Sequence, residues 1–76
     1  MESREFQRRL AVQLPPATLT VGQFCLTHNI SRALLYLLLR NGRGPRVMKA
    51  GRRTLISAEA AADWRRAMET ASAEDL

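Results

Sequence analysis

The chain has 76 residues, 46% of them apolar, which is enough for one small domain with its own core and too many for a fully disordered chain. Its single cysteine excludes an internal disulfide and a zinc site of the usual ligand spacing. The net charge is +5, and residues 6–58 hold nine of the twelve basic residues but none of the seven acidic ones. All but one of the basic residues are arginine, whose planar group suits phosphate oxygens and guanine edges, so this charge pattern indicates a polyanionic partner.

The apolar segments are too short for a membrane protein. The longest run of large apolar residues, Leu34–Leu39, is about a third of the length that crosses a bilayer. The N-terminus has no continuous apolar stretch of the kind found in secretory signals. We therefore expect a cytoplasmic protein, and a lone thiol agrees with a reducing compartment.

Two alternatives stay open for the N-terminal segment 1–18. Three of its apolar residues share a helical spacing of four, namely Phe6, Leu10 and Leu14. This spacing is typical of a short amphipathic helix, which Pro15-Pro16 would end. The alternative is a disordered basic arm that carries Arg8 and Arg9.

The segment LTVGQF has the pattern of a helix start. Thr20 can cap the helix, and Gln23, three residues later, completes a capping box. The apolar spacing then predicts a helix to about His28, with one buried face made of Val21, Phe24, Cys25 and His28. Asn29 follows, a residue that tolerates the left-handed conformation of a tight turn.

Ser31 is a second cap and predicts a helix from Arg32 to about Asn41. Two short helices joined by such a turn form a helix-turn-helix. Four leucines fall within an arc of about 140° and are expected to be buried, namely Leu34, Leu35, Leu38 and Leu39. The opposite arc is expected to be exposed and consists of Ala33, Tyr36, Leu37 and Arg40, with Arg32 at its border.

The segment RVMKAGRRTLIS predicts a β-hairpin with a turn centred on Ala50-Gly51. Its tip is expected to carry Lys49, Arg52 and Arg53. Ser57 can cap a last helix, in which Trp64 is expected to seal the hairpin onto the helical pair. The predicted buried stripe of this helix is Ala60, Ala61, Trp64, Ala67, Met68 and Ala71, and residues 72–76 are expected to fray.

The sequence does not indicate catalysis. One histidine, one cysteine and carboxylates confined to the ends of the chain provide neither a nucleophile–base pair nor a metal cluster. No glycine-rich loop followed by a lysine indicates a nucleotide site. We expect no enzymatic activity, no metal and no cofactor, and we interpret His28 and Cys25 as packing residues.

The predicted order of elements is helix, turn, helix, hairpin, helix, and this order resembles that of a known protein family. The segment TVGQFCLTHNISRALLYLLLRNGRGPRVMKAGRRTLISAEAAADW resembles the bacterial excisionase and AlpA-like winged helix-turn-helix family, a compact relative of the DNA-binding domain of MerR regulators. The resemblance covers residues 19 to about 68 and depends on QFC, IS, Tyr36, GRRTLIS and Trp64. It implies a mainly α fold with a two-stranded β-hairpin. Residues 19–71 would form the winged helix-turn-helix, between an N-terminal arm (1–18) and an acidic tail (72–76).

The resemblance also implies which residues touch DNA. The second helix would enter the major groove, and the hairpin, or wing, would reach phosphates or the adjacent minor groove. The groove-facing positions of the family correspond to Ser31, Arg32, Ala33, Tyr36 and Leu37, and the wing tip to Arg52 and Arg53. The charge pattern adds as candidate contacts Arg40 on the helix, Arg43 and Arg46 in the loop, and Lys49 in the wing.

This chain departs from the family at two positions of the second helix. Family members often carry a threonine where Leu34 stands and a basic residue where Leu37 stands. The second helix therefore has few hydrogen-bonding groups. We expect modest sequence specificity, with most of the affinity supplied by phosphate contacts.

Three functions follow as hypotheses. The first is an excisionase, or recombination directionality factor, that binds adjacent sites on double-stranded DNA cooperatively with other copies of itself, bends the duplex and assists an integrase. The second is a transcriptional regulator that binds a promoter. The third is a protein-interaction module in which the leucines, Leu37 above all, bind a partner helix. A DNA-binding protein of this kind is expected to be associated with the bacterial nucleoid while it is bound to DNA.

Overall fold

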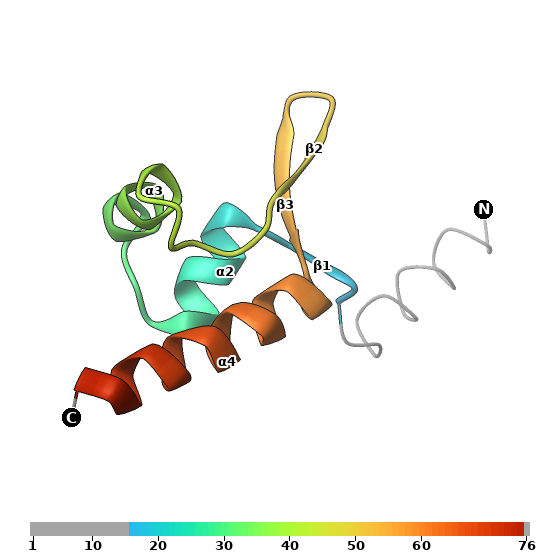
Figure 1. The fold of residues 1–76 in the computed structure, drawn as a ribbon. Coiled ribbons are helices and arrows are strands. Elements are labelled where there is room, and N and C mark those ends of the chain that lie inside the picture. Colours follow the sequence, from blue (N-terminus) through green and yellow to red (C-terminus); the bar gives the residue numbers. More distant parts are fainter. Residues whose placement is uncertain (1–15, 76) are drawn as a thin grey trace, which may run out of the picture.

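The computed structural model describes residues 16–75, so most of the segment for which an amphipathic helix or a basic arm was predicted lies outside the described residues. Residues 16–75 form a mainly helical fold with three helices and a small three-stranded antiparallel sheet (Figure 1). In chain order the elements are β1 (Thr18–Thr20), α2 (Val21–His28), α3 (Arg32–Arg40), β2 (Met48–Ala50), β3 (Arg53–Ser57) and α4 (Ala58–Asp75).

The predicted start and end of α2 are confirmed. The Thr20 hydroxyl accepts a hydrogen bond from the Gln23 backbone N–H at 3.1 Å, and the Gln23 side-chain oxygen accepts one from the Thr20 N–H at 2.9 Å. At the other end Asn29 has a φ of 58°, in the left-handed region. The Ile30 N–H then donates to the Cys25 carbonyl at 3.0 Å. These bonds satisfy terminal backbone groups that a helix cannot pair internally.

Helix α3 is bounded in the same way. The Ser31 hydroxyl accepts from the Leu34 N–H at 3.0 Å, which confirms the predicted cap. After the last turn the Arg43 N–H donates to the Leu38 carbonyl at 2.8 Å, and the Gly42 N–H donates to the Leu39 carbonyl at 3.2 Å. This pair of bonds closes the helix and directs the chain into the loop that leads to β2.

The buried face of α3 is narrower than predicted. Leu35 is fully buried, Leu39 packs against the core and Leu38 is half-buried, whereas Leu34 is exposed. The direction midway between Leu35 and Leu39 lies about 80° from Leu38 and about 120° from Leu34 around the helix axis. Because α3 packs mainly on one neighbour, α2, the core covers only a narrow stripe and Leu34 lies outside it.

The predicted two-stranded hairpin is present as β2–β3, but the sheet has a third strand, β1, which was not predicted. Strand β3 is central: β1 pairs with it antiparallel on one side, with Leu19 opposite Ile56, and β2 pairs on the other, with Lys49 opposite Thr54. A strand of three residues is too short for its alternation to be recognised in the sequence. Thr18 had therefore been assigned to the N-terminal arm, and Leu19 and Thr20 to the start of the following helix.

The turn of the hairpin lies one residue later than predicted. Ala50 pairs with Arg53, so Gly51 and Arg52 form a two-residue loop. Gly51 has a φ of 62°, whereas Arg52 does not have a positive φ. A positive φ at the first loop position alone is the pattern of a type II′ turn, for which glycine is preferred there. Arg52 therefore lies in the loop itself, and Arg53 begins β3.

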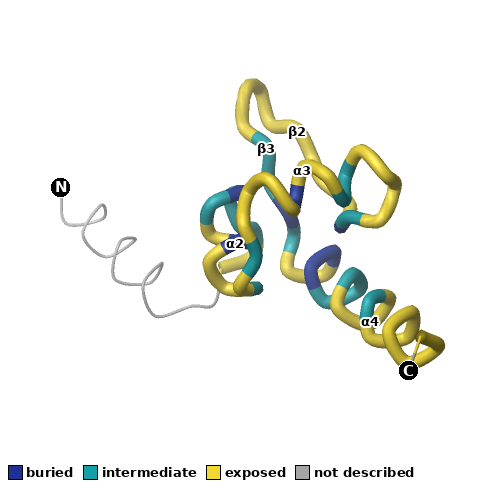
Figure 2. The backbone as a smooth tube through the Cα atoms, turned by 90° about the vertical axis from the view of Figure 1, so that its left-hand side faces the viewer, coloured by how far each residue is buried: buried dark blue, intermediate teal, exposed yellow. Residues whose placement is uncertain are grey.

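The core is small and lies where α2, α3, β3 and the start of α4 meet (Figure 2). Its largest fully buried side chains are Phe24, Leu35 and Ile56. The Phe24 ring stacks on His28 with centroids 4.0 Å apart, and Trp64 meets it edge-on at 5.3 Å. The Trp64 indole N–H donates to the Arg43 carbonyl at 2.9 Å. Trp64 thus joins α4 to α2 and to the loop that leads into the hairpin.

Strand β3 runs into α4 without a loop. The Ser57 hydroxyl accepts from the Ala60 N–H at 3.0 Å, as the predicted cap requires. The Ala58 N–H donates to the Ala17 carbonyl at 2.9 Å. The packed domain therefore includes Ala17 and Thr18, which the sequence had assigned to the N-terminal arm.

The buried stripe of α4 is shorter than predicted. Ala60 and Ala61 are buried, and Trp64 and Met68 are half-buried, but Ala67 and all residues of 69–75 are exposed. The helix continues through the stretch that was expected to fray, because alanine and glutamate favour a helix there. The predicted burial of Ala67 and Ala71 is wrong, since the second half of α4 extends past the other described elements (Figure 1).

Candidate nucleic-acid interface

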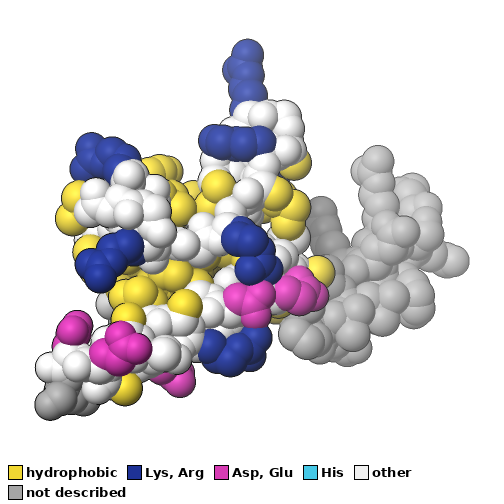
Figure 3. All heavy atoms as spheres, viewed as in Figure 1, with side chains coloured by type: hydrophobic (Ala, Val, Ile, Leu, Met, Phe, Trp, Pro, Cys, Tyr) yellow, Lys and Arg dark blue, Asp and Glu magenta, His cyan; other side chains and the backbone are white. Residues whose placement is uncertain are grey.

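Helix α3 and the β2–β3 hairpin project from the same side of the domain, and α4 lies on the other side (Figure 1; Figure 2). Within residues 16–75 every carboxylate side chain belongs to α4. Lys and Arg side chains accordingly gather over α3 and the hairpin, whereas the Asp and Glu side chains lie over α4, with some basic side chains beside them (Figure 3). The side of α3 and the hairpin is thus purely cationic among residues 16–75, whereas α4 carries five carboxylates together with Arg65 and Arg66.

All predicted DNA-contacting residues of α3 are exposed: Ser31, Arg32, Ala33, Tyr36, Leu37 and Arg40. They are presented by a helix whose start is held by the Ser31 cap and whose opposite side is anchored by Leu35. Tyr36 is 49% exposed and Leu37 is 44% exposed. The helix therefore offers a surface of mixed apolar and cationic character to a partner.

Two of these residues share one hollow with the hairpin. Arg32 and Tyr36 line it from α3, Arg52 and Arg53 line it from the hairpin, and the first turn of α2, at Thr20–Gly22, forms its wall. The volume of the hollow is about 290 Å³. Elements that are far apart in the sequence thus bring three guanidinium groups and a phenol around one space.

Gly22 allows the closest approach in this hollow. A Cβ atom at this position would lie 2.8 Å from Nη2 of Arg32, so the guanidinium rests against the bare backbone of α2. The start of a helix also carries partial positive charge. None of the three arginines Arg32, Arg52 and Arg53 forms an ion pair with a residue of 16–75. Such a concentration of positive charge without a carboxylate is favourable for an anionic ligand.

Sequence reasoning did not identify Gly22 as part of the site. Glycine is among the weakest helix formers, and its presence at the second position of α2 was the available signal. Its role becomes visible only when the side chain of Arg32, ten residues later, is placed against it.

We expect Gly22→Ala to weaken binding to a polyanion without lowering the thermal stability of the domain. Alanine is the better helix former by about 1 kcal/mol, and the atom it meets is the flexible end of Arg32, so the thermal midpoint should stay equal or rise slightly. The guanidinium must move away, and affinity for a polyanion should fall several-fold. Circular dichroism melts and fluorescence anisotropy with labelled duplex DNA measure the two effects. A variant that melts lower but binds normally would contradict this role of Gly22.

The other exposed cations of α3, the loop and the hairpin lie outside the hollow. Arg40, at the end of α3, is exposed, as is Arg43 in the loop that Trp64 holds through the Arg43 carbonyl. Lys49 is exposed in β2, and its ammonium group donates to the Thr54 hydroxyl at 2.6 Å across the hairpin. They extend the positive surface beyond the hollow.

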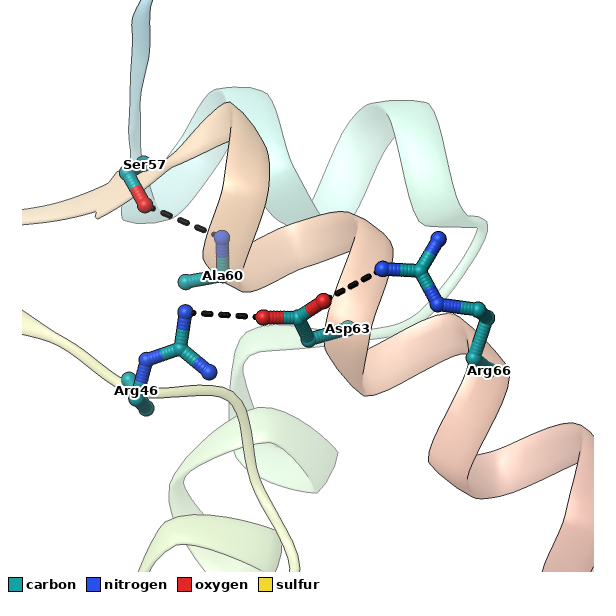
Figure 4. A network of polar contacts seen from close by, with 5 residues as sticks. All are labelled: Arg46, Ser57, Ala60, Asp63 and Arg66. Carbon is teal, nitrogen blue, oxygen red and sulfur yellow. Dashed lines mark hydrogen bonds and ion pairs between the residues drawn. The ribbon is translucent and has the colours of Figure 1, made fainter.

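Arg46 differs from the other predicted contacts. Its guanidinium lies 2.9 Å from a carboxylate oxygen of Asp63 on α4, and the second oxygen of Asp63 accepts from Arg66 (Figure 4). The hydrogen bonds from Arg46 and Arg66 lower the pKa of Asp63 below its usual value. Asp63 therefore stays ionised and compensates Arg46. The pairing joins residues seventeen positions apart, and no local pattern in the sequence marks it.

The basic residues of α4 also have partners. Arg65 lies 2.9 Å from Nε2 of His28, while Nδ1 of His28 lies 2.9 Å from the Phe24 carbonyl. A guanidinium can only donate, so Nε2 is the acceptor and Nδ1 carries the proton. The half-buried His28 thus packs in the domain, as predicted. Arg65 and Arg66 are engaged on α4, in contrast to the arginines of the hollow.

No protein-family model matches the chain, and no curated protein gives a significant match to it. No helix within the described part combines the length and apolar character needed to cross a membrane. Between Pro16 and Asp75, no three His, Cys, Asp or Glu side chains are grouped as ligands of a metal ion.

Proposed function

We propose that the chain is a double-stranded DNA-binding protein with a winged helix-turn-helix fold. Helices α2 and α3 would be the helix-turn-helix, α3 the recognition helix, and β2–β3 the wing. The observation that carries the proposal is the hollow between α3 and the hairpin, lined by Arg32, Tyr36, Arg52 and Arg53 and, among residues 16–75, by no carboxylate. The phosphates of a DNA strand are a polyanion that would match such a cationic surface.

The proposed binding mode follows from the placement of these elements. The first turn of α3, with Ser31, Arg32 and Ala33, would enter the major groove, which is wide enough for a helix. A backbone phosphate would then occupy the hollow between α3 and the hairpin. Arg52 in the loop would reach the next phosphates or the adjacent minor groove. Side chains of α3 and of the hairpin would thus together fix the position of the protein along the duplex.

Base recognition is expected to be limited. The exposed part of α3 includes the apolar residues Ala33, Leu34 and Leu37, which can touch a thymine methyl group but cannot hydrogen-bond to a base. Arg32, Tyr36 and Arg40 are its hydrogen-bonding groups of sufficient length. The affinity would therefore depend mainly on phosphates, and selectivity on DNA shape and cooperative binding.

We propose as the biological role an excisionase, or recombination directionality factor, which bends DNA and assists an integrase. The resemblance described above supports this role, and modest base readout combined with strong backbone binding suits it. A transcriptional regulator of the same fold is the alternative. Footprinting on the DNA that flanks the gene distinguishes them, because protection of an attachment site supports the first and protection of a promoter supports the second.

The dependence of DNA affinity on salt tests the proposal. If about five of the exposed cations of α3, the loop and the hairpin neutralise phosphates, the logarithm of affinity should fall against the logarithm of salt concentration with a slope of about −4 to −5. Anisotropy titrations between low and physiological salt measure this slope. A flat dependence would remove the basis for the proposed interface.

A protein-interaction module is a second candidate, because α3 exposes two leucines, Leu34 and Leu37, at 40% and 44%. In that case the leucines would bind a partner helix and the arginines would serve solubility. Gel shifts decide between the candidates, since the module predicts no DNA complex even at low salt.

A further inference from the structure

The loop between α3 and β2 is held at its start by both α3 and α4. The Arg43 carbonyl accepts a hydrogen bond from the Trp64 indole N–H at 2.9 Å. A Cβ atom added at the next residue, Gly44, would lie 3.1 Å from the backbone nitrogen of Leu39, so the loop backbone rests against the last turn of α3. The first half of the loop therefore has a fixed position relative to the two helices.

The second half of the loop is held by α4. Pro45 is buried, and its ring fixes its φ dihedral. The Arg46 guanidinium lies 2.9 Å from one carboxylate oxygen of Asp63, whose other oxygen accepts from Arg66 on the same helix (Figure 4). Strand β2 begins at Met48, two residues further along the chain. The contact between Arg46 and Asp63 thus lies where the hairpin leaves the body of the domain.

We propose that Arg46 is a positioning residue, which holds the base of the β2–β3 hairpin against α4 through Asp63 and does not bind a DNA phosphate. Phosphate binding in the hollow requires Arg32 of α3 and Arg52 of the hairpin to lie at a suitable separation. A hairpin whose base is not held would have to be ordered on binding, which reduces affinity. The effect on DNA affinity rests on the proposed function, whereas the placement of the hairpin does not.

The direction of the Arg46 side chain supports this role. Its guanidinium is turned towards Asp63 on α4 (Figure 4), whereas α3 and the hairpin project from the other side of the domain (Figure 1). To bind a phosphate, Arg46 would have to give up a carboxylate. Arg43 and Arg52 form no ion pair with a residue of 16–75, so they can bind phosphates without such a loss.

The salt dependence of binding distinguishes a positioning residue from a phosphate contact, because each phosphate contact contributes about 0.9 to the slope. We expect Arg46→Ala to weaken duplex binding about two- to fivefold, as the loss of an exposed ion pair allows, and to leave the salt slope unchanged. Arg52→Ala removes the same charge and should make the slope shallower by about 0.9. Anisotropy titrations at several salt concentrations measure both. A slope that is shallower by this amount in Arg46→Ala would overturn the proposal.

The variant Asp63→Asn has opposite expected effects for the two roles of Arg46. If Arg46 positions the hairpin, Asp63→Asn should weaken binding by a similar factor, and combining it with Arg46→Ala should cause no further loss. If Arg46 were instead a phosphate contact for which Asp63 competes, Asp63→Asn would bind more tightly, with a steeper slope. Glu69→Gln is the control, since it removes a carboxylate of α4 that forms no ion pair within residues 16–75, and it should not weaken binding.

Amide hydrogen exchange in the free protein tests the placement of the hairpin without DNA. Met48 and Leu55 pair at the base of the hairpin, and their amides should exchange about two- to fivefold faster in Arg46→Ala and Asp63→Asn but not in Arg52→Ala. Far-UV circular dichroism checks that all variants keep their helices. Unchanged exchange in Arg46→Ala would refute the proposal. A wild-type protein that binds no duplex even at low salt would contradict the proposed function, and the exchange rates would still decide the role of Arg46.

Discussion

Replacing Arg52 and Arg53 together with alanine should weaken binding to duplex DNA about tenfold to a hundredfold near physiological salt. Both side chains line the hollow beside α3 and make no ion pair with another described residue. Contacts to phosphates carry no sequence information, so the loss should be similar on every duplex. The salt slope should become shallower by about 1.8, since each phosphate contact contributes about 0.9. Anisotropy titrations on two unrelated duplexes at several salt concentrations measure both quantities.

Arg65 and Arg66 provide the matched control for this experiment. Their replacement with alanine changes the net charge by the same amount, but they lie on α4 and contact His28 and Asp63. Because the proposed DNA face is on the other side of the domain, this double variant should lose little affinity. If both double variants bind equally weakly, the net charge and not the placement of the arginines governs binding. The assigned interface would then be wrong.

Phe24→Ala should destabilise the domain by about 3 to 5 kcal/mol. Phe24 is fully buried and contacts both His28 and Trp64, so its removal leaves a cavity where α2 meets α4. For a domain of this size the loss is a large part of the total free energy of unfolding, and the thermal midpoint should fall by more than about 12 °C. Urea unfolding followed by circular dichroism measures the change.

Leu26→Ala in the same helix is the control for Phe24→Ala. Leu26 is 79% exposed, so its truncation should change the free energy of unfolding by no more than about 0.5 kcal/mol. A comparable loss in the two variants would mean that Leu26 is covered by something outside the described residues. It would also mean that the core is wider than residues 16–75 show.

The helix boundaries could be predicted because their causes are local. The caps of α2 and α3 join a hydroxyl to a backbone N–H three residues later, and the left-handed turn depends on Asn29 alone. Strand β1 depends on a partner that lies almost forty residues further along the chain, with Thr18 opposite Ser57. Its three residues have no recognisable pattern of their own. The sequence therefore located the helices well and missed one edge of the sheet.

Which residues are buried, and which form the candidate site, also depends on contacts between elements that are distant in the sequence. Helical periodicity predicted which leucines could face the core, but the number of neighbours of α3 decided that Leu34 is exposed. Composition predicted that arginines would bind an anion. Which of them share a hollow depends on Gly22 beside Arg32, and which is compensated depends on Asp63 beside Arg46. Both arrangements require the packed chain and cannot be deduced from spacing.

The confinement of the described carboxylates to α4 has a consequence for the approach to a partner (Figure 3). Helix α4 also carries Arg65 and Arg66 but is net negative, so the domain, with its cations on the opposite side, has an electric dipole moment. In the field of a polyanion it experiences a torque that turns its cationic end forward before any contact is made. Productive collisions would then be a larger share of all collisions than for a molecule that arrives in random orientation. Added salt would screen the field over a shorter distance and so reduce this alignment. The association rate constant would therefore fall as the salt concentration rises.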